Sequence, residues 1–153
     1  VVIVGKEDWK SPNLNAIINT EIQQRIIFTG GVSDEELTAI YALAKIFCFP
    51  SYAEGFGLPP LEAMASGVPV IVSNRTALPE VCGDAAVYIN PDEPQSIADA
   101  INLLLADKNT YNLKRNAGLK RAELFSWKKS ETKLMDSILK TSNTSSKHSP
   151  FNL

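Results

Sequence analysis

Short apolar runs and longer amphipathic stretches alternate along this chain. The runs are rich in Val, Ile and Phe, and polar residues do not interrupt them at every second position. They occupy residues 1–5, 25–29, 46–50, 69–73 and 86–89. Runs of this kind are typical of strands buried on both faces, as in a parallel sheet. With helices between them, they predict an α/β fold with a doubly wound, Rossmann-like parallel sheet.

The stretches between the runs carry helix start signals. Ser11 followed by Pro12 indicates a cap and a first helical residue. Ser33 and Glu36 have the spacing of a capping box. The helix after this box should present one apolar face, which consists of Leu37, Ile40, Tyr41 and Ala44.

Four further helices are expected. One covers about 58–66 and ends at Gly67, because glycine suits a helix C-terminus. Another covers 94–106, and two more cover about 109–125 and 127–141. The helix at 94–106 should turn these residues inward: Ile97, Ile101, Leu104 and Leu105.

Length and composition predict one domain over 1–141 and a disordered, Ser/Asn-rich tail over 142–153. The chain opens within an apolar run without a leader, which suggests a fragment of a longer protein. Cys48, Cys82 and a single His, His148, do not suit a structural zinc site. So few cysteines fit a reducing cytoplasm best.

Charge is distributed unevenly. Residues 1–107 carry 5 Lys/Arg and 14 Asp/Glu, whereas residues 108–153 carry 10 and 3. The basic part is either a solvated face packed near the acidic part, or an interface with a partner domain or an anionic membrane surface. Nucleic acid is a poor candidate, because aromatic residues do not interleave with the basic ones.

The loop after the third run carries the candidate chemistry. Glu54 lies in this loop, and Glu62 follows eight positions later, inside the next helix. Gly55 and Gly57 would let backbone approach a ligand closely. The first amides of the helix, around Phe56 and Leu58, would face a phosphate, and Pro59 suits the first turn.

Both carboxylates would repel a phosphate, so their expected partners are hydroxyl groups. Glu62 could accept both donors of a ribose diol, and Glu54 would lie nearer the sugar. Without any ligand, Glu62 could simply favour the helix N-terminus, and Glu54 could be an ordinary loop residue. The combination of glycines, prolines and two carboxylates favours a sugar nucleotide.

A second wall of the site is expected at the turn after the second run. Gly30 and Gly31 there would let backbone hydrogen-bond the edge of a base. The alternative is an ordinary tight turn.

These segments together resemble the C-terminal, donor-binding half of family 4 glycosyltransferases, the retaining enzymes of GT-B fold. The resemblance covers roughly residues 1–140. It is carried by RIIFTGGVSDEEL, IFCFPSYAEGFGLPPLEAMASGVPVI, SNRTALPEVCGDAAVYINP and RAELFSWKKS. The central block contains the E-x7-E signature of that family, formed here by Glu54 and Glu62.

The resemblance implies a role for each site residue. Glu54 would be the catalytic residue that faces the transferred sugar, and Glu62 would bind the ribose. Backbone of Gly31 and Val32 would meet the base. Sugar and phosphate would be held by Gly55, Phe56, Gly57, Leu58 and Pro59, of which Pro59 has no amide hydrogen. On this basis neither glutamate is a nucleophile, and both act by positioning and electrostatics.

The resemblance also implies what the full enzyme needs. The first candidate for the donor is GDP-mannose, and the second is a UDP-sugar. The enzyme would need no cofactor and no metal. The acceptor would be a glycan or a lipid-linked glycan of polysaccharide assembly, and the whole enzyme would be cytoplasmic with peripheral membrane contact. Its first strand, its Arg/Lys phosphate clamp and its N-terminal acceptor domain would precede Val1, so the fragment alone would be inactive. Lys6 and Lys10 follow the wrong strand for that clamp.

Two other functions remain open. One is a non-catalytic nucleotide- or sugar-binding regulatory module. The other is a dinucleotide-dependent enzyme such as an epimerase, although the residues after Gly5 lack the Gly-x-Gly-x-x-Gly pattern of that class.

Overall fold

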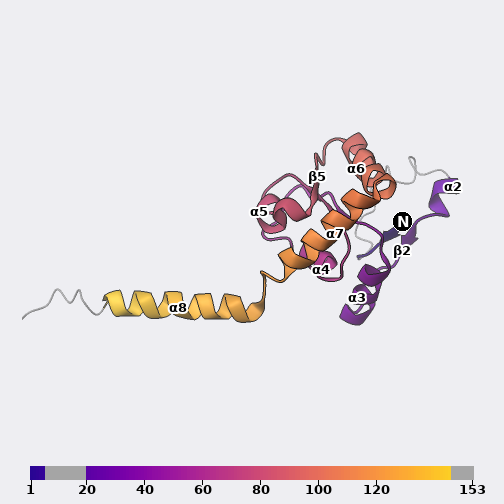
Figure 1. The fold of residues 1–153 in the computed structure, drawn as a ribbon. Coiled ribbons are helices and arrows are strands. Elements are labelled where there is room, and N and C mark those ends of the chain that lie inside the picture. Colours follow the sequence, from indigo (N-terminus) through magenta and orange to yellow (C-terminus); the bar gives the residue numbers. More distant parts are fainter. Residues whose placement is uncertain (6–19, 146–153) are drawn as a thin grey trace, which may run out of the picture. The chain divides into compact units, whose positions relative to one another are not determined.

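A computed structural model describes residues 1–5 and 20–145 of the chain (Figure 1). The predicted helix start at Ser11, the two lysines Lys6 and Lys10, and residues 146–153 lie outside the described residues. The chain divides into two compact units, Val1–Leu43 and Ala44–Leu153. Parallel strands connected by helices build both units, which confirms the predicted α/β fold class.

Among its described residues, the first unit contains two short parallel strands and two helices. Strand β1 (Val2–Ile3) pairs with β2 (Ile27–Phe28) in parallel, and α2 (Thr20–Gln23) precedes β2. The predicted capping box begins α3 (Asp34–Leu43): the Ser33 amide donates to Glu36 Oε2 at 2.8 Å, and the Glu36 amide donates to Ser33 Oγ at 3.3 Å. On the predicted apolar face of α3, Tyr41 is buried.

The second unit is built on a three-stranded parallel sheet. Its strand order is β3 (Phe47–Phe49), β4 (Val70–Ser73), β5 (Val87–Ile89), with Cys48 opposite Ile71 and Val72 opposite Tyr88. All residues of the central strand β4 are buried, as an uninterrupted apolar run predicts. The strands predicted at 46–50, 69–73 and 86–89 are therefore confirmed.

Helices α4 (Leu58–Ala65) and α6 (Pro94–Ala106) occur where the sequence predicts them. A short helix α5 (Leu78–Cys82) and a 3₁₀ turn η1 (Gly83–Ala85) between β4 and β5 were not predicted. The sequence signal for α5 is Pro79 near its start, followed by Gly83, which has a φ of 52° just after its end.

Helix α6 packs its apolar face onto the sheet. Ala100 and Leu104 join Ile71 and Ile89 in one buried cluster, and Ile97 and Ile101 pack against it. The expectation that Leu105 also faces inward is wrong, since that side chain is 58% exposed. Successive helical residues are about 100° apart, so Leu105 cannot share the direction of Leu104.

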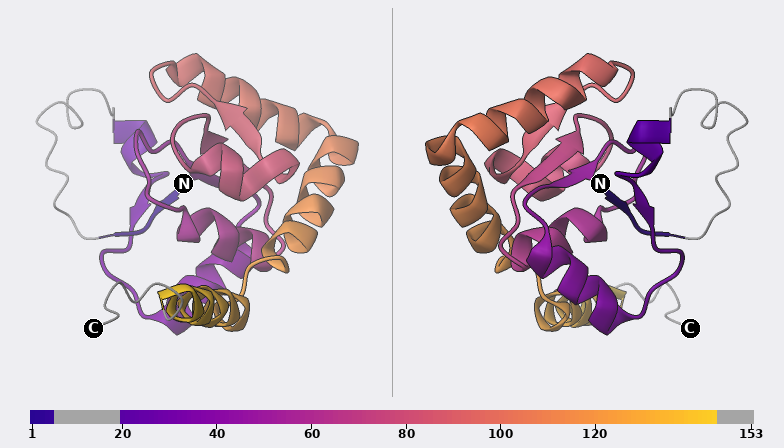
Figure 2. Two further views of the ribbon diagram at one scale, coloured as in Figure 1. Left: turned by 90° about the vertical axis from the view of Figure 1, so that its left-hand side faces the viewer. Right: turned by 90° about the vertical axis from the view of Figure 1, so that its right-hand side faces the viewer.

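Helix α7 (Lys108–Ala122) follows α6 directly (Figure 2). Asp107 caps it: Oδ1 accepts from the amides of Asn109 and Thr110 at 2.9 and 3.2 Å. Thr110 Oγ1 also donates to Oδ2 at 2.7 Å, and this hydrogen bond, followed by the two amide contacts, holds the pKa of the Asp107 carboxyl below its ordinary value. The helix ends before the predicted residue 125, because the amides of Leu124 and Phe125 turn back to carbonyls three residues earlier.

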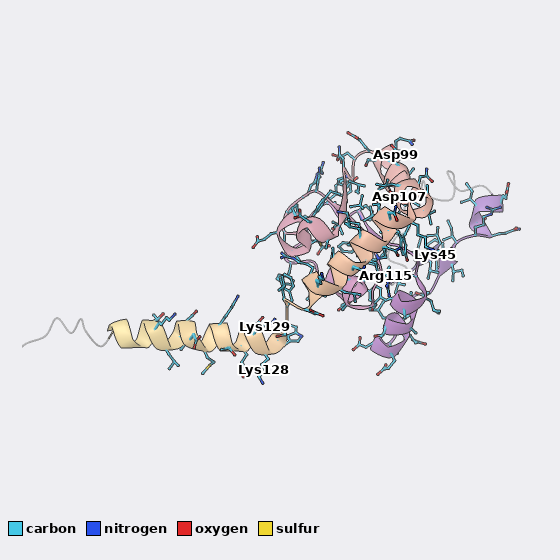
Figure 3. All side chains as sticks on the ribbon, viewed as in Figure 1. Lys45, Asp99, Asp107, Arg115, Lys128 and Lys129 are labelled. Carbon is cyan, nitrogen blue, oxygen red and sulfur yellow. The ribbon has the colours of Figure 1, made fainter. Side chains whose placement is uncertain are left out.

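Basic side chains of α7 donate to backbone carbonyls at or near the ends of neighbouring helices. Arg115 Nε donates to the Gly67 carbonyl at 3.2 Å, beyond α4, and Arg121 Nε donates to the Val81 carbonyl at 2.8 Å, within α5. Lys114 Nζ donates to the Asp84 carbonyl of η1 at 2.8 Å. Figure 3 labels Arg115 on this helix and Asp107 just before its start. For α7, the basic charge therefore serves packing near the acidic part of the chain.

Helix α8 (Trp127–Ser145) extends four residues beyond the predicted end at 141. Its side chains from Trp127 to Thr141 are exposed, including Lys128 and Lys129 at its start (Figure 3). Among the described residues, no helix has the length and apolar character that crossing a membrane requires.

Candidate ligand-binding site

The loop that carries Glu54 lies at the carboxyl end of the sheet. Strand β3 ends at Phe49, the loop follows from Pro50, and α4 begins at Leu58. The loops after β4 and β5 leave the same end, because the three strands are parallel. In open α/β sheets, ligands bind outside the carboxyl ends of the strands. The predicted site therefore has the expected place in the second unit.

Glu54 is held by both its side chain and its backbone. Ser51 Oγ donates to Glu54 Oε1 at 2.9 Å, and the Glu54 amide donates to Thr76 Oγ1 at 3.0 Å. Thr76 follows β4 and has a φ of 52°, a left-handed conformation that β-branched residues rarely adopt. The sequence suggested neither Ser51 nor Thr76, since only the fold brings Thr76 beside the loop of Glu54.

Gly57 forms the turn into α4. Its φ of 104° and ψ of 49° place it in a region that favours glycine, whereas Gly55 has no positive φ. No side chain caps the helix at this position. Pro59 and Pro60 occupy its first turn, so among the first four residues of α4 only Leu58 and Leu61 carry an amide hydrogen. Donors for a phosphate are therefore fewer than at an ordinary helix N-terminus.

Glu62 lies on α4 at the edge of a cavity of about 540 Å³. The lining also includes Phe56, Leu58 and Leu61 from the loop and α4, and Phe125 and Trp127 from the junction of α7 and α8. The Phe56 ring meets the Phe125 ring edge to face, with centroids 5.9 Å apart. Glu62 is exposed, whereas Glu54 is half-buried and does not line this cavity.

A cation that the sequence did not single out lies beside this loop. The Arg75 guanidinium lies over the Tyr52 ring, 5.7 Å from its centroid. The same group donates to Asn90 Oδ1 at 3.4 Å and forms an ion pair with Asp92. Arg75 follows β4, and Asn90 follows β5. The signal that could have identified Arg75 in the sequence was its position just after the apolar run of β4, at the carboxyl end of a predicted strand.

The two predicted base-contacting residues belong to the first unit. Gly31 and Val32 follow Gly30, whose φ is 68°, and the Gly30 carbonyl accepts from the Gly5 amide at 3.1 Å. Contact between these residues and a base remains a prediction.

Within the described ranges 1–5 and 20–145, no group of three or more His, Cys, Asp and Glu residues could hold a metal ion. The two thiols are free, and burial raises the pKa of both Cys48 and Cys82, that of Cys82 to about 11. Neither thiol has the lowered pKa of a reactive cysteine.

Comparison with known proteins identifies the sequence family. The profile of the family described as "Glycosyl transferases group 1" matches residues 1–121. The O-antigen chain mannosyltransferase B of Escherichia coli is 37% identical over 137 residues, which are 89% of this chain and 36% of that protein. The MMP alpha-(1->4)-mannosyltransferase of Mycolicibacterium hassiacum is 36% identical over 129 residues, which are 82% of this chain and 31% of that protein.

Solved structures share the fold. Sucrose-phosphate synthase from Thermosynechococcus elongatus superposes with a TM-score of 0.77 at 26% identity, covering 92% of this chain and 38% of that one. Anabaena Alr3699/HepE, solved in complex with UDP and glucose, superposes with a TM-score of 0.79 at 22% identity, covering 91% and 40%. The chain thus spans between about a third and two fifths of these relatives.

Proposed function

Because this chain belongs to the group 1 glycosyl transferases, we propose that it is the part of a retaining, metal-independent hexosyltransferase that binds the nucleotide-sugar donor. The observation that supports this role best is the Glu54–Glu62 block. It begins at the carboxyl end of β3, with Glu54 tied to the loop after β4 and Glu62 on α4.

In this proposal, Glu62 accepts hydrogen bonds from the ribose hydroxyls. It is exposed and lines the cavity, so a ligand can reach its carboxylate. An ionised carboxylate offers two acceptor oxygens to a vicinal diol. The sugar and the phosphate are held by the backbone amides of Gly55, Phe56, Gly57 and Leu58. Pro59 and Pro60 cannot contribute a hydrogen bond of this kind, because a proline has no amide hydrogen.

Glu54 is proposed to face the transferred sugar. Its carboxylate is oriented by Ser51, and its backbone is fixed by Thr76. A negative charge at a fixed point can stabilise positive charge that develops on the sugar ring in the transition state. Such preorganised groups act without moving during the reaction, which suits a residue held at two points.

Mannose from GDP-mannose is the proposed group transferred, and a UDP-sugar is the second candidate. The names of the similar mannosyltransferases support mannose. The acceptor in this proposal is a glycan or a lipid-linked glycan. We place the whole enzyme in the cytoplasm with peripheral membrane contact, where the free thiols of Cys48 and Cys82 would persist.

The test uses the full-length protein and calorimetric titration with GDP-mannose, UDP-glucose, GDP and UDP. Either GDP-mannose and GDP or UDP-glucose and UDP should bind. Glu62→Gln should lower the affinity for both ligands of that pair by about ten- to a hundredfold, which is the loss expected for hydrogen bonds to a charged acceptor. Glu54→Gln should lower the affinity for the nucleotide sugar and leave the affinity for the nucleoside diphosphate unchanged.

Glu123→Gln is the matched control, since this exposed glutamate lies after α7 and outside the proposed site. It should bind as the wild type does. Unchanged nucleotide affinity in Glu62→Gln would refute the ribose assignment. Failure of the wild type to bind any of the four ligands would refute the donor-binding role itself.

A further inference from the structure

Arg75 joins three loops at the carboxyl end of the sheet. It belongs to the loop after β4, its guanidinium lies over Tyr52 of the loop after β3, and it donates to Asn90 after β5. Asp92 completes the arrangement as an ion-pair partner. We call Tyr52, Arg75, Asn90 and Asp92 the arginine clamp. All four belong to the second unit.

The clamp adjoins the residue that fixes Glu54. Thr76 comes directly after Arg75, and its Oγ1 accepts the hydrogen bond of the Glu54 amide. Its φ of 52° is unfavourable for a β-branched residue and persists only where the surroundings enforce it. The Arg75 guanidinium is held by Tyr52 on its face and by Asn90 and Asp92 at its edge. These contacts restrict the backbone of Arg75, the residue directly before Thr76.

We propose that Arg75 is a positioning residue for the transferred sugar, acting through Thr76 on the loop of Glu54. The inference rests on the proposed donor-binding function. If the clamp opens, Thr76 can relax toward an ordinary backbone conformation, and the Glu54 amide loses its partner. Glu54 then no longer faces the sugar in one fixed direction, although the rest of the site persists.

The chemistry of arginine suits this role better than a direct contact with phosphate. A planar guanidinium can stack on an aromatic face while its edge donates in the ring plane, which an ammonium group cannot do. The charge of Arg75 is already opposed by Asp92, and its side chain is 37% exposed. An exposed pair of this kind contributes little to overall stability. Loss of the clamp should therefore change the loop more than the fold.

The test is a double-mutant cycle in the full-length protein. Dissociation constants are measured for GDP-mannose and GDP, and for UDP-glucose and UDP, with wild type, Arg75→Ala, Glu54→Gln and the double variant. Arg75→Ala should raise the dissociation constant of the nucleotide sugar about five- to tenfold. The dissociation constant of the nucleoside diphosphate should stay within about twofold of the wild-type value. In the Glu54→Gln background, Arg75→Ala should have no further effect, because both changes remove the same interaction.

Two further variants sharpen the test. Arg75→Lys keeps the charge but should not restore the affinity, because lysine cannot stack and donate as the guanidinium does. Arg25→Ala is the matched control: Arg25 forms an exposed ion pair with Glu21 in the first unit, and this variant should bind as the wild type does. Thermal midpoints of all variants should agree within a few degrees.

Each other outcome contradicts a named part of the argument. Equal weakening of the nucleotide sugar and the nucleoside diphosphate would indicate that Arg75 contacts phosphate, and would overturn the positioning role. Additive losses in the double variant would show that Arg75 does not act through Glu54. If the wild type binds neither nucleotide pair, the proposed function fails as well.

Discussion

Gly57 and Leu78 lie so close together that a β-carbon on Gly57 would be 2.7 Å from Leu78 Cδ2. Leu78 begins α5 and is completely buried, so it has little room to move. The loop of Glu54 thus rests directly on the helix that follows β4. The predicted reason for this glycine was close approach of a ligand, and the structure adds a packing reason.

Gly57→Ala should destabilise the protein and displace the start of α4. The left-handed φ of 104° alone costs an alanine about 1–2 kcal/mol, and the contact with Leu78 adds to this cost. The free energy of unfolding, measured with urea, checks the prediction. Gly55→Ala is the matched control, because no atom lies within 4 Å of its β-carbon and its φ is not positive. Equal stability of the two variants would contradict the argument.

Gly118→Leu should separate α7 from α4. A β-carbon on Gly118 would already lie 3.1 Å from Met64 Cγ, and Met64 is buried. Overpacking of this kind costs about 1–3 kcal/mol. Asn116→Leu adds a leucine to the exposed face of the same helix and should change stability by less than about 0.5 kcal/mol. The measurement is the midpoint of thermal unfolding of both variants. Equal midpoints would refute the close packing of α4 and α7 at Gly118.

Asp107 should contribute to stability in a pH-dependent way. Its hydrogen bonds to Thr110 and Asn109 lower the pKa of the carboxyl in the folded state. A lowered pKa means that the contribution is present above the unfolded value of roughly 3.9 and is lost as the pH falls through the folded value. Asp107→Asn keeps an acceptor but does not titrate.

The measurement for Asp107 is the unfolding free energy of both proteins between pH 7 and pH 3. The wild type should be more stable at pH 7, and this advantage should decrease below about pH 4. An advantage that stays constant over this range would show that the capping carboxylate is not the titrating group.

Cys82 should resist alkylation in the folded protein. It is completely buried, and burial raises the pKa of its thiol to about 11, although the nearby Arg121 acts in the opposite direction. At pH 8 the reactive thiolate is therefore scarce, and the rate with iodoacetamide should fall to about a hundredth of that of a free thiol or less. The Cys48→Ser variant isolates the signal, and the rate should rise to the free-thiol value in denaturant. Rapid reaction without denaturant would contradict the burial.

Most secondary structure of this chain follows from local patterns. Uninterrupted apolar runs predicted β3, β4 and β5, and the capping box at Ser33 predicted the start of α3. The third apolar run and the glycines and prolines after it placed Glu54 on a loop and Glu62 on the following helix, as found. These features depend on residues within a few positions of each other, so a single segment carries the whole signal.

The tertiary structure decided the contacts between distant segments. Glu54 meets Thr76, which lies 22 positions later, and Arg121 reaches the carbonyl of Val81, 40 positions earlier. It also decided that Leu104 faces the core and Leu105 does not, because the sheet accepts one side of α6. The sequence by itself determined strands β3, β4 and β5, helices α4 and α6, and the places of Glu54 on a loop and Glu62 on a helix, since these follow from local hydrophobicity and turn residues. Only folding determined that Thr76 contacts Glu54 and that Arg75 contacts Tyr52, since the proximity of these loops depends on the parallel pairing of strands.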